Sequence, residues 1–250
     1  MKQKGLVWIG TSNTTLPGNK STFPPGFQDK SRLHYYATIF NTVEINSCFY
    51  KTPQLSTYEK WALDVPDDFR FTLKLSKLIT HSKEILVDLA CMENFLQTAY
   101  GTGEKKGCLL IQFPGKLTLD EFEKVERILY QLKECDPLNL WRKAVEFRNP
   151  TWYTGEALEM LDEFGASMVL HDHPKAKNSD LVSRADFIYL RYHGPKGNYR
   201  ESYTPEFLRS QAAFINEMKD KDKEVFVYFN NTIGNAFENA LDLKVLLAGL

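Results

Sequence analysis

The sequence predicts an α/β protein, a single TIM-type (β/α)8 barrel with a polar cavity at the carboxyl ends of its strands. Strand-like and helix-like segments alternate along all 250 residues, as in a closed barrel of this kind. No linker, low-complexity tract or change of composition divides the chain, so we expect one domain over residues 1–250. The third observation is that one face of most strands carries polar side chains.

Eight runs rich in β-branched and aromatic residues, each closed by turn-forming residues, predict the strands. They are LVWIGTS (6–12), TVEINSCF (42–49), RFTLKLS (70–76), GCLLIQFP (107–114), KAVEFRN (143–149), SMVLHDH (167–173), FIYLRYHG (187–194) and EVFVYFNN (224–231).

Helical periodicity fills most of the connections between these runs. We predict helices over 31–40, 55–64, 85–100, 117–134, 155–165, 205–220 and 234–249. The stretch 174–185 predicts a short or irregular crossover instead. Segment 13–27 is rich in Pro, Gly, Ser and Thr and is too long for a simple connection. We interpret it as a βα loop enlarged for function or for covering the barrel mouth.

Bulk composition narrows the range of partners and compartments. Lys and Arg number 31 against 32 Asp and Glu, a balance that argues against a protein that coats phosphate backbones. The four cysteines form no C-x-x-C pair, so neither a zinc ribbon nor a disulfide framework is indicated. No apolar run is long enough to cross a bilayer, and the N-terminus enters a strand without a signal region. We expect a cytoplasmic protein without a membrane partner; the oligomeric state stays open.

Alternation along the strands assigns their two faces. The helix-facing set is apolar and comprises Val43, Ile45, Phe71, Leu73, Leu75, Leu109, Ile111, Phe113, Val145, Phe147, Ile188, Leu190, Tyr192, Val225, Val227 and Phe229. The opposite, inward set is polar and comprises Glu44, Asn46, Lys74, Gln112, Glu146, Arg148, Arg191, His193, Tyr228 and Asn230, with His171 or Asp172 from the sixth strand.

These inward groups gather toward the carboxyl ends of the strands, where barrel enzymes place their sites. A charge in such a place is costly unless it is paired or solvated by a ligand. A structural ion-pair network would explain one pair. For ten groups on six or more strands we favour a functional site.

Several motifs, taken in order along the chain, carry a resemblance to a known family. They are IGTS, TVEINSCFY, FRFTLKLSKLITH, CLLIQFP, VEFRNPTWY, YLRYHGPKGNY and VYFNNTIGNAFENA. They resemble the YecE-like proteins, the family labelled domain of unknown function 72, from about residue 6 to residue 245. The resemblance implies a TIM-type barrel and supplies no activity. This chain departs from the family pattern after GTS: members usually have Gly-Trp there, and this chain has Asn13 and Thr14.

Carried over motif by motif, the resemblance implies a set of shared polar positions. They are Glu44, Asn46, Tyr50, Lys74, His81, Gln112, Glu146, Arg148, Trp152, Arg191, His193, Asn230 and Asn231. Most of them are the inward groups that strand alternation selects independently.

The cations suggest an anionic ligand. Lys74, Arg148 and Arg191 form a positive cluster, and arginine binds carboxylate or phosphate in bidentate fashion. The loops after the last two strands often hold a phosphate in these barrels. Here Gly194, Gly197 and the helix start at Gly234–Asn235 could present backbone amides, or the glycines could merely shape tight turns.

Candidate proton-transfer groups are Glu44, Glu146 and His193. A glycosidase pair of carboxylates is a weaker interpretation, because both glutamates have cationic neighbours. Lys74 could form a Schiff base, although an inward lysine more often binds an anion. The cofactor is unknown. A divalent metal on His171, His173, Glu44, Glu146 and His193 is a minority hypothesis, because the nearby cations would repel it.

Aromatic loop residues add a further possibility for the ligand. Tyr50, Trp152, Tyr153, Tyr199 and Tyr203 could stack on a sugar or base, or could pack loops together. Our leading hypothesis is an enzyme acting on a small phosphorylated or carboxylated metabolite, with Asn46, Tyr50, Gln112, Arg148, Trp152, Arg191, Asn230 and Asn231 binding it. The alternatives are a nucleotide- or nucleic-acid-binding or -processing protein and a non-catalytic ligand-binding barrel.

Overall fold

The computed structural model describes residues 5–82, 89–178 and 180–249. Its strands are β1 (Val7–Thr11), β2 (Thr42–Ile45), β3 (Arg70–Lys74), β4 (Lys106–Gln112), β5 (Arg142–Glu146), β6 (Ser167–Met168), β7 (Leu170–His171), β8 (Phe187–Tyr192) and β9 (Glu224–Phe229). They form two sheets, a four-stranded one in the order β1-β9-β8-β7 and a five-stranded one in the order β2-β3-β4-β5-β6. Every pairing within the two sheets is parallel.

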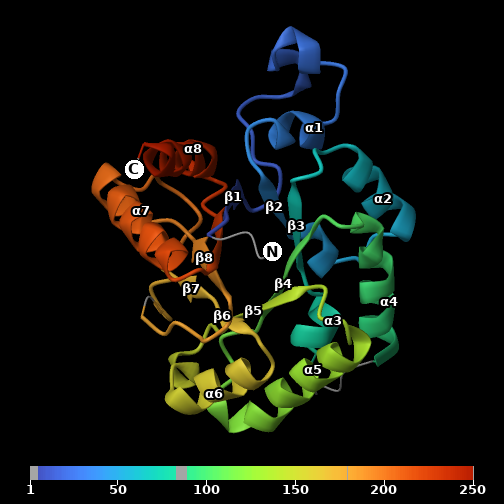
Figure 1. The fold of residues 1–250 in the computed structure, drawn as a ribbon, viewed down its shortest axis with the longest axis vertical. Coiled ribbons are helices and arrows are strands. Elements are labelled where there is room, and N and C mark those ends of the chain that lie inside the picture. Colours follow the sequence, from blue (N-terminus) through green and yellow to red (C-terminus); the bar gives the residue numbers. More distant parts are fainter. Residues whose placement is uncertain (1–4, 83–88, 179, 250) are drawn as a thin grey trace.

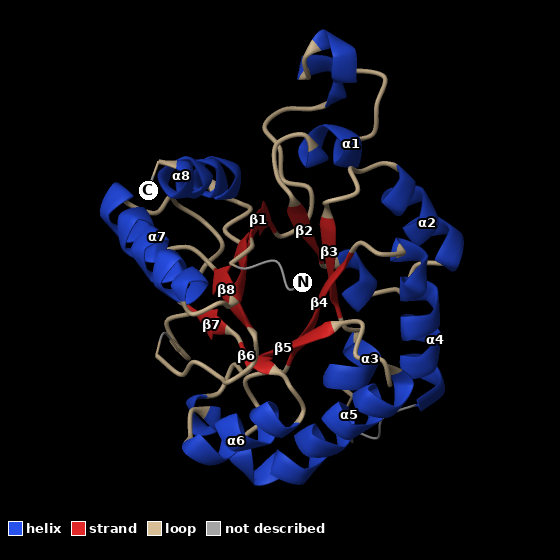
Figure 2. Cartoon of the chain, viewed as in Figure 1, coloured by secondary structure: helices blue, strands red, loops and turns tan. Residues whose placement is uncertain are grey.

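The strands surround a common centre, and the helices lie outside them (Figure 2). The sixth strand predicted from the sequence serves both sheets: β6 pairs with β5, and β7 pairs with β8. Between them the amide of Val169 donates to the carbonyl of Val145 at 2.9 Å. The eight predicted strand regions are all present, with this one divided in two. The ladder of hydrogen bonds runs as two sheets rather than as one closed sheet.

Side chains bridge the second junction, between β1 and β2. Asn41 accepts from the amide of Ile9 and donates to the carbonyl of Val7, both at 2.9 Å. The Tyr36 hydroxyl accepts from the amide of Thr11 at 2.7 Å and donates to the carbonyl of Thr42. The two strands approach so closely that a Cβ on Gly10 would lie 2.1 Å from that carbonyl oxygen. The strands are therefore neighbours, joined mainly through side chains.

The helices are α1 (Arg32–Ala37), α2 (Leu55–Leu63), α3 (Lys77–Thr80), α4 (Leu89–Ala99), α5 (Phe122–Cys135), α6 (Gly155–Glu163), α7 (Pro205–Asp220) and α8 (Ala236–Ala248) (Figure 1). Residues 85–88 of the predicted helix 85–100 lie outside the described residues. The prediction of 205–220 is confirmed to the residue. There Thr204 caps the helix by accepting from the amide of Phe207, and Pro205 stands at the first helical position.

Alternation along the strands separates two apolar layers. All sixteen residues of the predicted helix-facing set are buried in one large core together with apolar residues of the helices. The opposite parity forms a smaller second core that contains Trp8, Cys108, Leu110, Phe226 and Tyr228. The inward-facing side of the strands is thus apolar toward one end, and the polar groups described below are confined to the other.

Segment 13–27 lies beside α1 at the edge of the molecule, away from the centre of the strands (Figure 1). Arg32 donates to the carbonyls of Thr14 and Leu16 at 2.9 and 2.6 Å. Phe23 packs on Tyr35 with ring centroids 4.7 Å apart. The segment is therefore fastened to α1 and does not cover the mouth.

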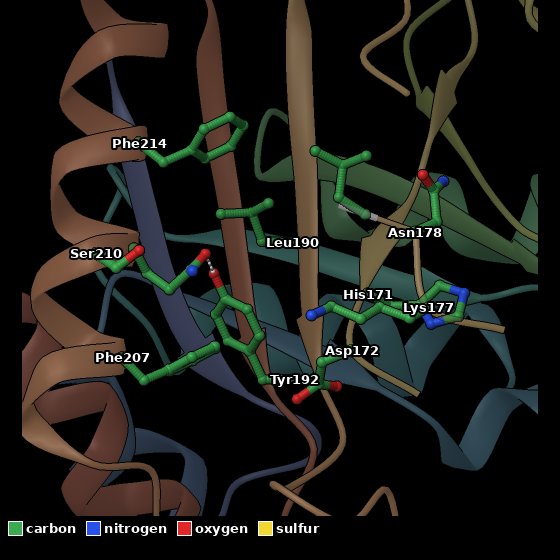
Figure 3. Close-up of a pocket in the computed structure, with 11 residues that line it drawn as sticks. His171, Asp172, Lys177, Asn178, Leu190, Tyr192, Phe207, Ser210 and Phe214 are labelled. Carbon is green, nitrogen blue, oxygen red and sulfur yellow. Dashed lines mark hydrogen bonds between the residues drawn. The ribbon is translucent and has the colours of Figure 1, made fainter. Parts of the chain in front are cut away.

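The crossover after β7 is irregular, as predicted, and its described parts, 174–178 and 180–186, form no helix. The outer face of β7 and β8 is consequently covered by this loop and by α7. A cavity of about 220 Å³ lies between them, with Leu170, Leu190, Phe207 and Phe214 as its apolar walls (Figure 3). Among the described residues no helix is both long and apolar enough to cross a membrane.

Candidate functional site

Polar side chains from β2, β3, β4, β5 and β8 meet at the carboxyl ends of these parallel strands. Glu44 is on β2, Lys74 ends β3, Gln112 ends β4 and Glu146 ends β5. The register places Gln112 directly beside Glu146. Arg191 reaches the same region from β8, in the other sheet. The site therefore spans both sheets.

Glu44 and Arg191 form a sealed ion pair. The Arg191 Nε and Nη2 atoms donate to the two carboxylate oxygens of Glu44, at 2.9 Å for each best contact. The hydroxyls of Ser12 and Tyr189 also donate to Glu44, each at 2.6 Å. Burial opposes the charged form of Glu44, but the guanidinium and these hydroxyls hold the pKa of this carboxyl below its ordinary value. With both oxygens saturated, Glu44 is placed to fix Arg191 rather than to exchange protons.

Glu146 lies between two guanidinium groups. It accepts from Arg191 Nη1 at 3.2 Å and from Arg148 Nε. Its side chain is fully buried, while that of Arg148 is 11 % exposed. Burial alone would raise the pKa of Glu146, yet Arg148 and Arg191 keep it well below the usual range. Glu146 is therefore an ionised carboxylate that orients Arg148, which explains why adjacent inward positions of one strand carry opposite charges.

His193 is held in one tautomer. Its Nε2 atom lies 2.8 Å from both Arg148 Nη2 and Arg191 Nη1, which can only donate. The ring proton therefore sits on Nδ1, which faces Asp172 Oδ1 at 3.3 Å. Asp172 also accepts from the Tyr203 hydroxyl. Burial and the two neighbouring arginines lower the pKa of His193 well below its ordinary value, so this imidazole is neutral and its lone pair is occupied.

His171 and His173 pack against His193, with ring centroids 5.6 and 5.7 Å from it. His171 Nε2 donates to the carbonyl of Phe147 at 3.0 Å, and burial lowers the pKa of His171 to about 4. Across the described ranges 5–82, 89–178 and 180–249, no group of three or more His, Cys, Asp or Glu residues is arranged to hold a metal. The sequence hypothesis of a metal on these histidines and the two glutamates has no geometric support.

Lys74 differs from the two arginines. Its Nζ atom donates to Gln112 Oε1 at 2.8 Å and lies 4.1 Å from the centre of the Phe49 ring. No carboxylate of the described chain forms an ion pair with it, and the side chain is only partly buried. Burial, reinforced by the nearby Arg191 charge, lowers the pKa of Lys74 to about 8. Lys74 is thus a half-buried amine without a counter-ion.

Two further features adjoin Lys74. Arg148 uses Nε and Nη2 in the contacts above, and no described residue accepts from its Nη1. His81 packs edge-on against the same Phe49 ring at 5.0 Å. Burial and the charge of Lys74 lower the pKa of His81 to about 4, so its imidazole is neutral at physiological pH. The open part of the site therefore combines an amine, an unused guanidinium N–H and a neutral imidazole.

Comparison with known proteins places this chain in a family. The family described as "Protein of unknown function DUF72" matches residues 8–249. The chain is a DUF72 protein. UPF0759 protein YunF of Bacillus subtilis (strain 168) is 26% identical over 274 residues, covering 97% of this chain and 95% of that protein.

Solved structures of the family share the fold of this DUF72 protein. A DUF72 family protein of Thermotoga maritima MSB8 is 27% identical and superimposes with a TM-score of 0.80, covering 97% of this chain and 99% of the other. One from Enterococcus faecalis V583 is 22% identical, with a TM-score of 0.81, and covers 97% and 96%. The names of these relatives contain no substrate or reaction.

Some predicted binding residues of the DUF72 protein lie away from the open part of the site. Trp152 is fully buried and stacks on Phe147 with ring centroids 4.3 Å apart, and its Nε1 donates to the carbonyl of Leu117. Tyr50 is 71% exposed, with Lys77 Nζ 5.6 Å from its ring. Packing explains Trp152 without a ligand, whereas Tyr50 is on the surface and accessible.

The asparagines of the site take different positions. Asn46 donates to Glu44 at 3.0 Å, so it supports the sealed pair. The Asn231 side chain is buried and donates to the carbonyl of Glu201 and to Asn239 Oδ1. Asn230 is almost fully buried, and its backbone amide donates to the carbonyl of Tyr192. Asn231 therefore fastens the loops after β8 and β9 to each other.

The glycine-rich loops after β8 and β9 shape this junction. The amide of Gly194 donates to the Tyr203 hydroxyl at 2.6 Å, that of Gly197 to the carbonyl of Gly194, and that of Gly234 to the carbonyl of Asn231. A Cβ on Gly234 would lie 2.4 Å from the carbonyl oxygen of Glu201. The glycines allow the loops to pack closely, and their amides are already engaged. The predicted phosphate cradle is therefore not formed by these three amides.

Proposed function

We propose that this DUF72 protein is an enzyme that binds a small metabolite through a carboxylate or phosphate group, between Lys74 and Arg148. The two sheets would act as one closed barrel, with this site at its mouth. We also propose that it works in the cytoplasm, where buried thiols such as Cys48 and Cys108 remain reduced.

The observation that carries the proposal is the unpaired charge of Lys74. Glu44 and Glu146 neutralise two positive charges, and Arg148 and Arg191 already supply them. Lys74 adds a third cation, at the end of β3, and forms no ion pair with a described carboxylate; Glu44 and Glu146 act on it only from a greater distance. A partly buried charge without a partner is unfavourable, and an anionic ligand would relieve that cost while using the spare Nη1 of Arg148.

We also infer a separate role for each charged or titratable residue of the site. Glu44 and Glu146 are ionised and hold guanidinium groups in place. His193 is neutral with its Nε2 occupied, so it orients Arg148 instead of acting as a base. Lys74, with a pKa of about 8, is the group of the cluster that can change its protonation state near neutral pH. We therefore assign proton transfer to Lys74 and anion binding jointly to Lys74 and Arg148.

A thermal-shift screen of the purified protein tests the proposal. The panel contains phosphorylated sugars, nucleotides, organic acids, short oligonucleotides and divalent metals. A ligand that binds only the folded state raises the melting temperature. At a ligand concentration one hundred times its Kd, the free energy of unfolding increases by about 2.7 kcal/mol. We expect a small organic acid or sugar phosphate to raise it, and Arg148→Ala to abolish that rise.

Arg209→Ala is the matched control, because this exposed arginine on α7 pairs only with Glu206 among its described contacts. It should leave the ligand-induced shift intact. A shift with oligonucleotides alone would replace the metabolite by a nucleic acid. An equal ligand-induced shift in the Arg148→Ala protein would overturn the proposed site.

A further inference from the structure

We propose that Lys74 forms a covalent imine with the carbonyl carbon of a small 2-oxo carboxylate whose carboxylate is held by Arg148. This inference rests on the proposed anion site and names its substrate class and its reactive group. The geometry supports it through three features: an amine that lacks a counter-ion, a guanidinium N–H that lacks an acceptor, and an aromatic face beneath the amine.

The first feature concerns the availability of the nitrogen. A lysine can attack a carbonyl only when it is unprotonated, and an ion pair with a carboxylate would keep it protonated. The described contacts of Lys74 Nζ are an amide oxygen, that of Gln112 at 2.8 Å, and the face of Phe49 at 4.1 Å. The pKa of Lys74, lowered to about 8, agrees with this environment, because a useful fraction of the amine is then neutral at physiological pH.

The second feature brings the two cations toward one small substrate. Lys74 ends β3 and Arg148 follows the end of β5, four residues beyond Ala144, which is level with Lys74 in the register. Their side chains bridge this offset, because Lys74 contacts Gln112 and Arg148 contacts Glu146, and these two partners lie side by side on β4 and β5. A small molecule lying over Gln112 and Glu146 can therefore contact both cations. A carboxylate beside the carbonyl carbon would meet the spare Nη1 of Arg148 as the carbonyl meets Nζ.

The third feature favours the product of the reaction. An imine of this kind is protonated and so keeps the positive charge that the ammonium carried. The Phe49 face attracts a cation whether it is an ammonium or an iminium. Forming the covalent bond therefore leaves the charge balance of the site unchanged.

The Lys74 ammonium releases one proton to water, which reaches this half-buried side chain, and the nitrogen lone pair attacks the C2 carbonyl carbon. The resulting carbinolamine regains a proton on its hydroxyl, which leaves as water while the C=N bond forms. Because the guanidinium of Arg148 stabilises the charged carboxylate, loss of CO2 is disfavoured. The iminium instead withdraws electrons from C3 and activates its C–H bond.

Borohydride trapping of the full-length protein tests this proposal. The protein is incubated separately with pyruvate, 2-oxobutyrate and 2-oxoglutarate, and sodium borohydride is added as the hydride donor. We expect one adduct per chain, with the mass of the oxo acid less one oxygen atom, and peptide mapping should place it on Lys74. The labelling rate should rise with pH to a plateau above about pH 8, following the lysine pKa.

Two variants and one control separate the parts of the proposal. Lys74→Arg keeps the cation and should lose the adduct, whereas Lys77→Arg, an exposed position on α3, should keep it. Arg148→Gln should reduce trapping of the oxo acids by about tenfold or more, as expected for loss of a charge-assisted hydrogen bond. Trapping of propanal, which has no carboxylate, should fall less than trapping of the oxo acids, because it loses only the influence of the Arg148 charge on the Lys74 pKa.

The possible results decide between the two proposals. If an oxo acid raises the melting temperature through Arg148 but no adduct forms on Lys74, the imine is overturned and the anion site stands. If there is neither a thermal shift nor an adduct with any ligand tested, both fail. Labelling spread over surface lysines and equal in Lys74→Arg also overturns the imine.

Discussion

Arg191 and Lys74 are cations of the same polar cluster, yet the structure treats them in opposite ways. Arg191 is 2% exposed and is saturated by Glu44, Glu146 and His193. Lys74 is partly exposed, has a neutral amide as its hydrogen-bond partner among the described residues, and has a lowered pKa, whereas that of Arg191 is raised. The comparison shows that convergent charges need not share a role: the enclosed pair builds the site, and the unpaired amine is available for a ligand.

Among the variants proposed here, one that breaks the sealed Glu44–Arg191 ion pair should have the largest effect on the free energy of unfolding. Glu44→Gln would leave the Arg191 guanidinium buried beside a neutral amide. Removing one partner of a buried ion pair costs about 3–5 kcal/mol. We expect a loss of that size in the free energy of unfolding, measured by urea denaturation. Glu206→Gln, which removes an exposed pair, should leave it nearly unchanged. Equal stabilities of the two variants would show that Glu44 does not hold the site together.

The second prediction concerns the pH dependence of the contribution that Lys74 makes to stability. Its pKa falls from 10.5 in the unfolded chain to about 8 in the folded protein. Between these pH values the unfolded chain binds more protons, so this group's contribution to the free energy of unfolding increases as pH rises from about 8 to about 10.5. The increase should be on the order of 2 kcal/mol. It is read as the difference between wild type and Lys74→Met in urea unfolding at successive pH values. A flat difference across this window would mean that Lys74 titrates normally.

The third prediction separates ligand binding from stability. Lys74→Met removes the unpaired charge together with the cost of burying it and keeps most of the apolar length, so we expect the free energy of unfolding at pH 7 to stay equal or to rise. The affinity for the anionic ligand identified by the thermal-shift screen should fall by about tenfold or more, because a charge-assisted contact is lost. Isothermal titration calorimetry measures this affinity. A large loss of stability with unchanged affinity would exchange the roles we give to Lys74 and Arg191.

The smallest effect on stability and on anion affinity is expected for a change at Lys77, three residues after Lys74. Lys77 is exposed, and its Nζ atom lies over the Tyr50 ring at 5.6 Å. Lys77→Ala should change the free energy of unfolding by less than about 0.5 kcal/mol. Its effect on anion affinity should be at most about twofold, since an exposed charge acts through high-dielectric solvent. A tenfold loss of affinity in the same titration would move the anion toward the surface formed by Lys77 and Tyr50.

Local patterns predicted the positions of the strands and the directions of their side chains. Val145 and Phe147 face the helices, and Glu146 and Arg148 face the opposite way, because alternation has a period of two residues that local sequence fixes. The helix over 205–220 was equally accessible, since its Thr204 cap and Pro205 are local signals. At position 13 the backbone takes a left-handed φ of 57°, a conformation that suits glycine and that asparagine tolerates.

Long-range pairings could not be predicted in the same way. Nothing near Arg191 indicates that one guanidinium will join Glu44 of β2 to Glu146 of β5, because those contacts span 147 and 45 residues of sequence. The tautomer of His193 depends on two arginines and on Asp172 from other elements. Asn41 has no local signal for its place between β1 and β2, where it supplies hydrogen bonds to the strand backbone. Trp152 shares a motif with the site and yet packs in the outer core.

Direct observation of the ionisation of Lys74 shows whether this amine lacks a counter-ion in the free protein and gains one when an anion binds. Nuclear magnetic resonance of lysine labelled with carbon-13 at Cε reports the titration, and Lys74→Arg assigns the signal. We predict an inflection near pH 8, which moves to higher pH when the ligand anion is added, because an anion stabilises the ammonium form. An inflection near pH 10.5 that responds to no anion would contradict the account.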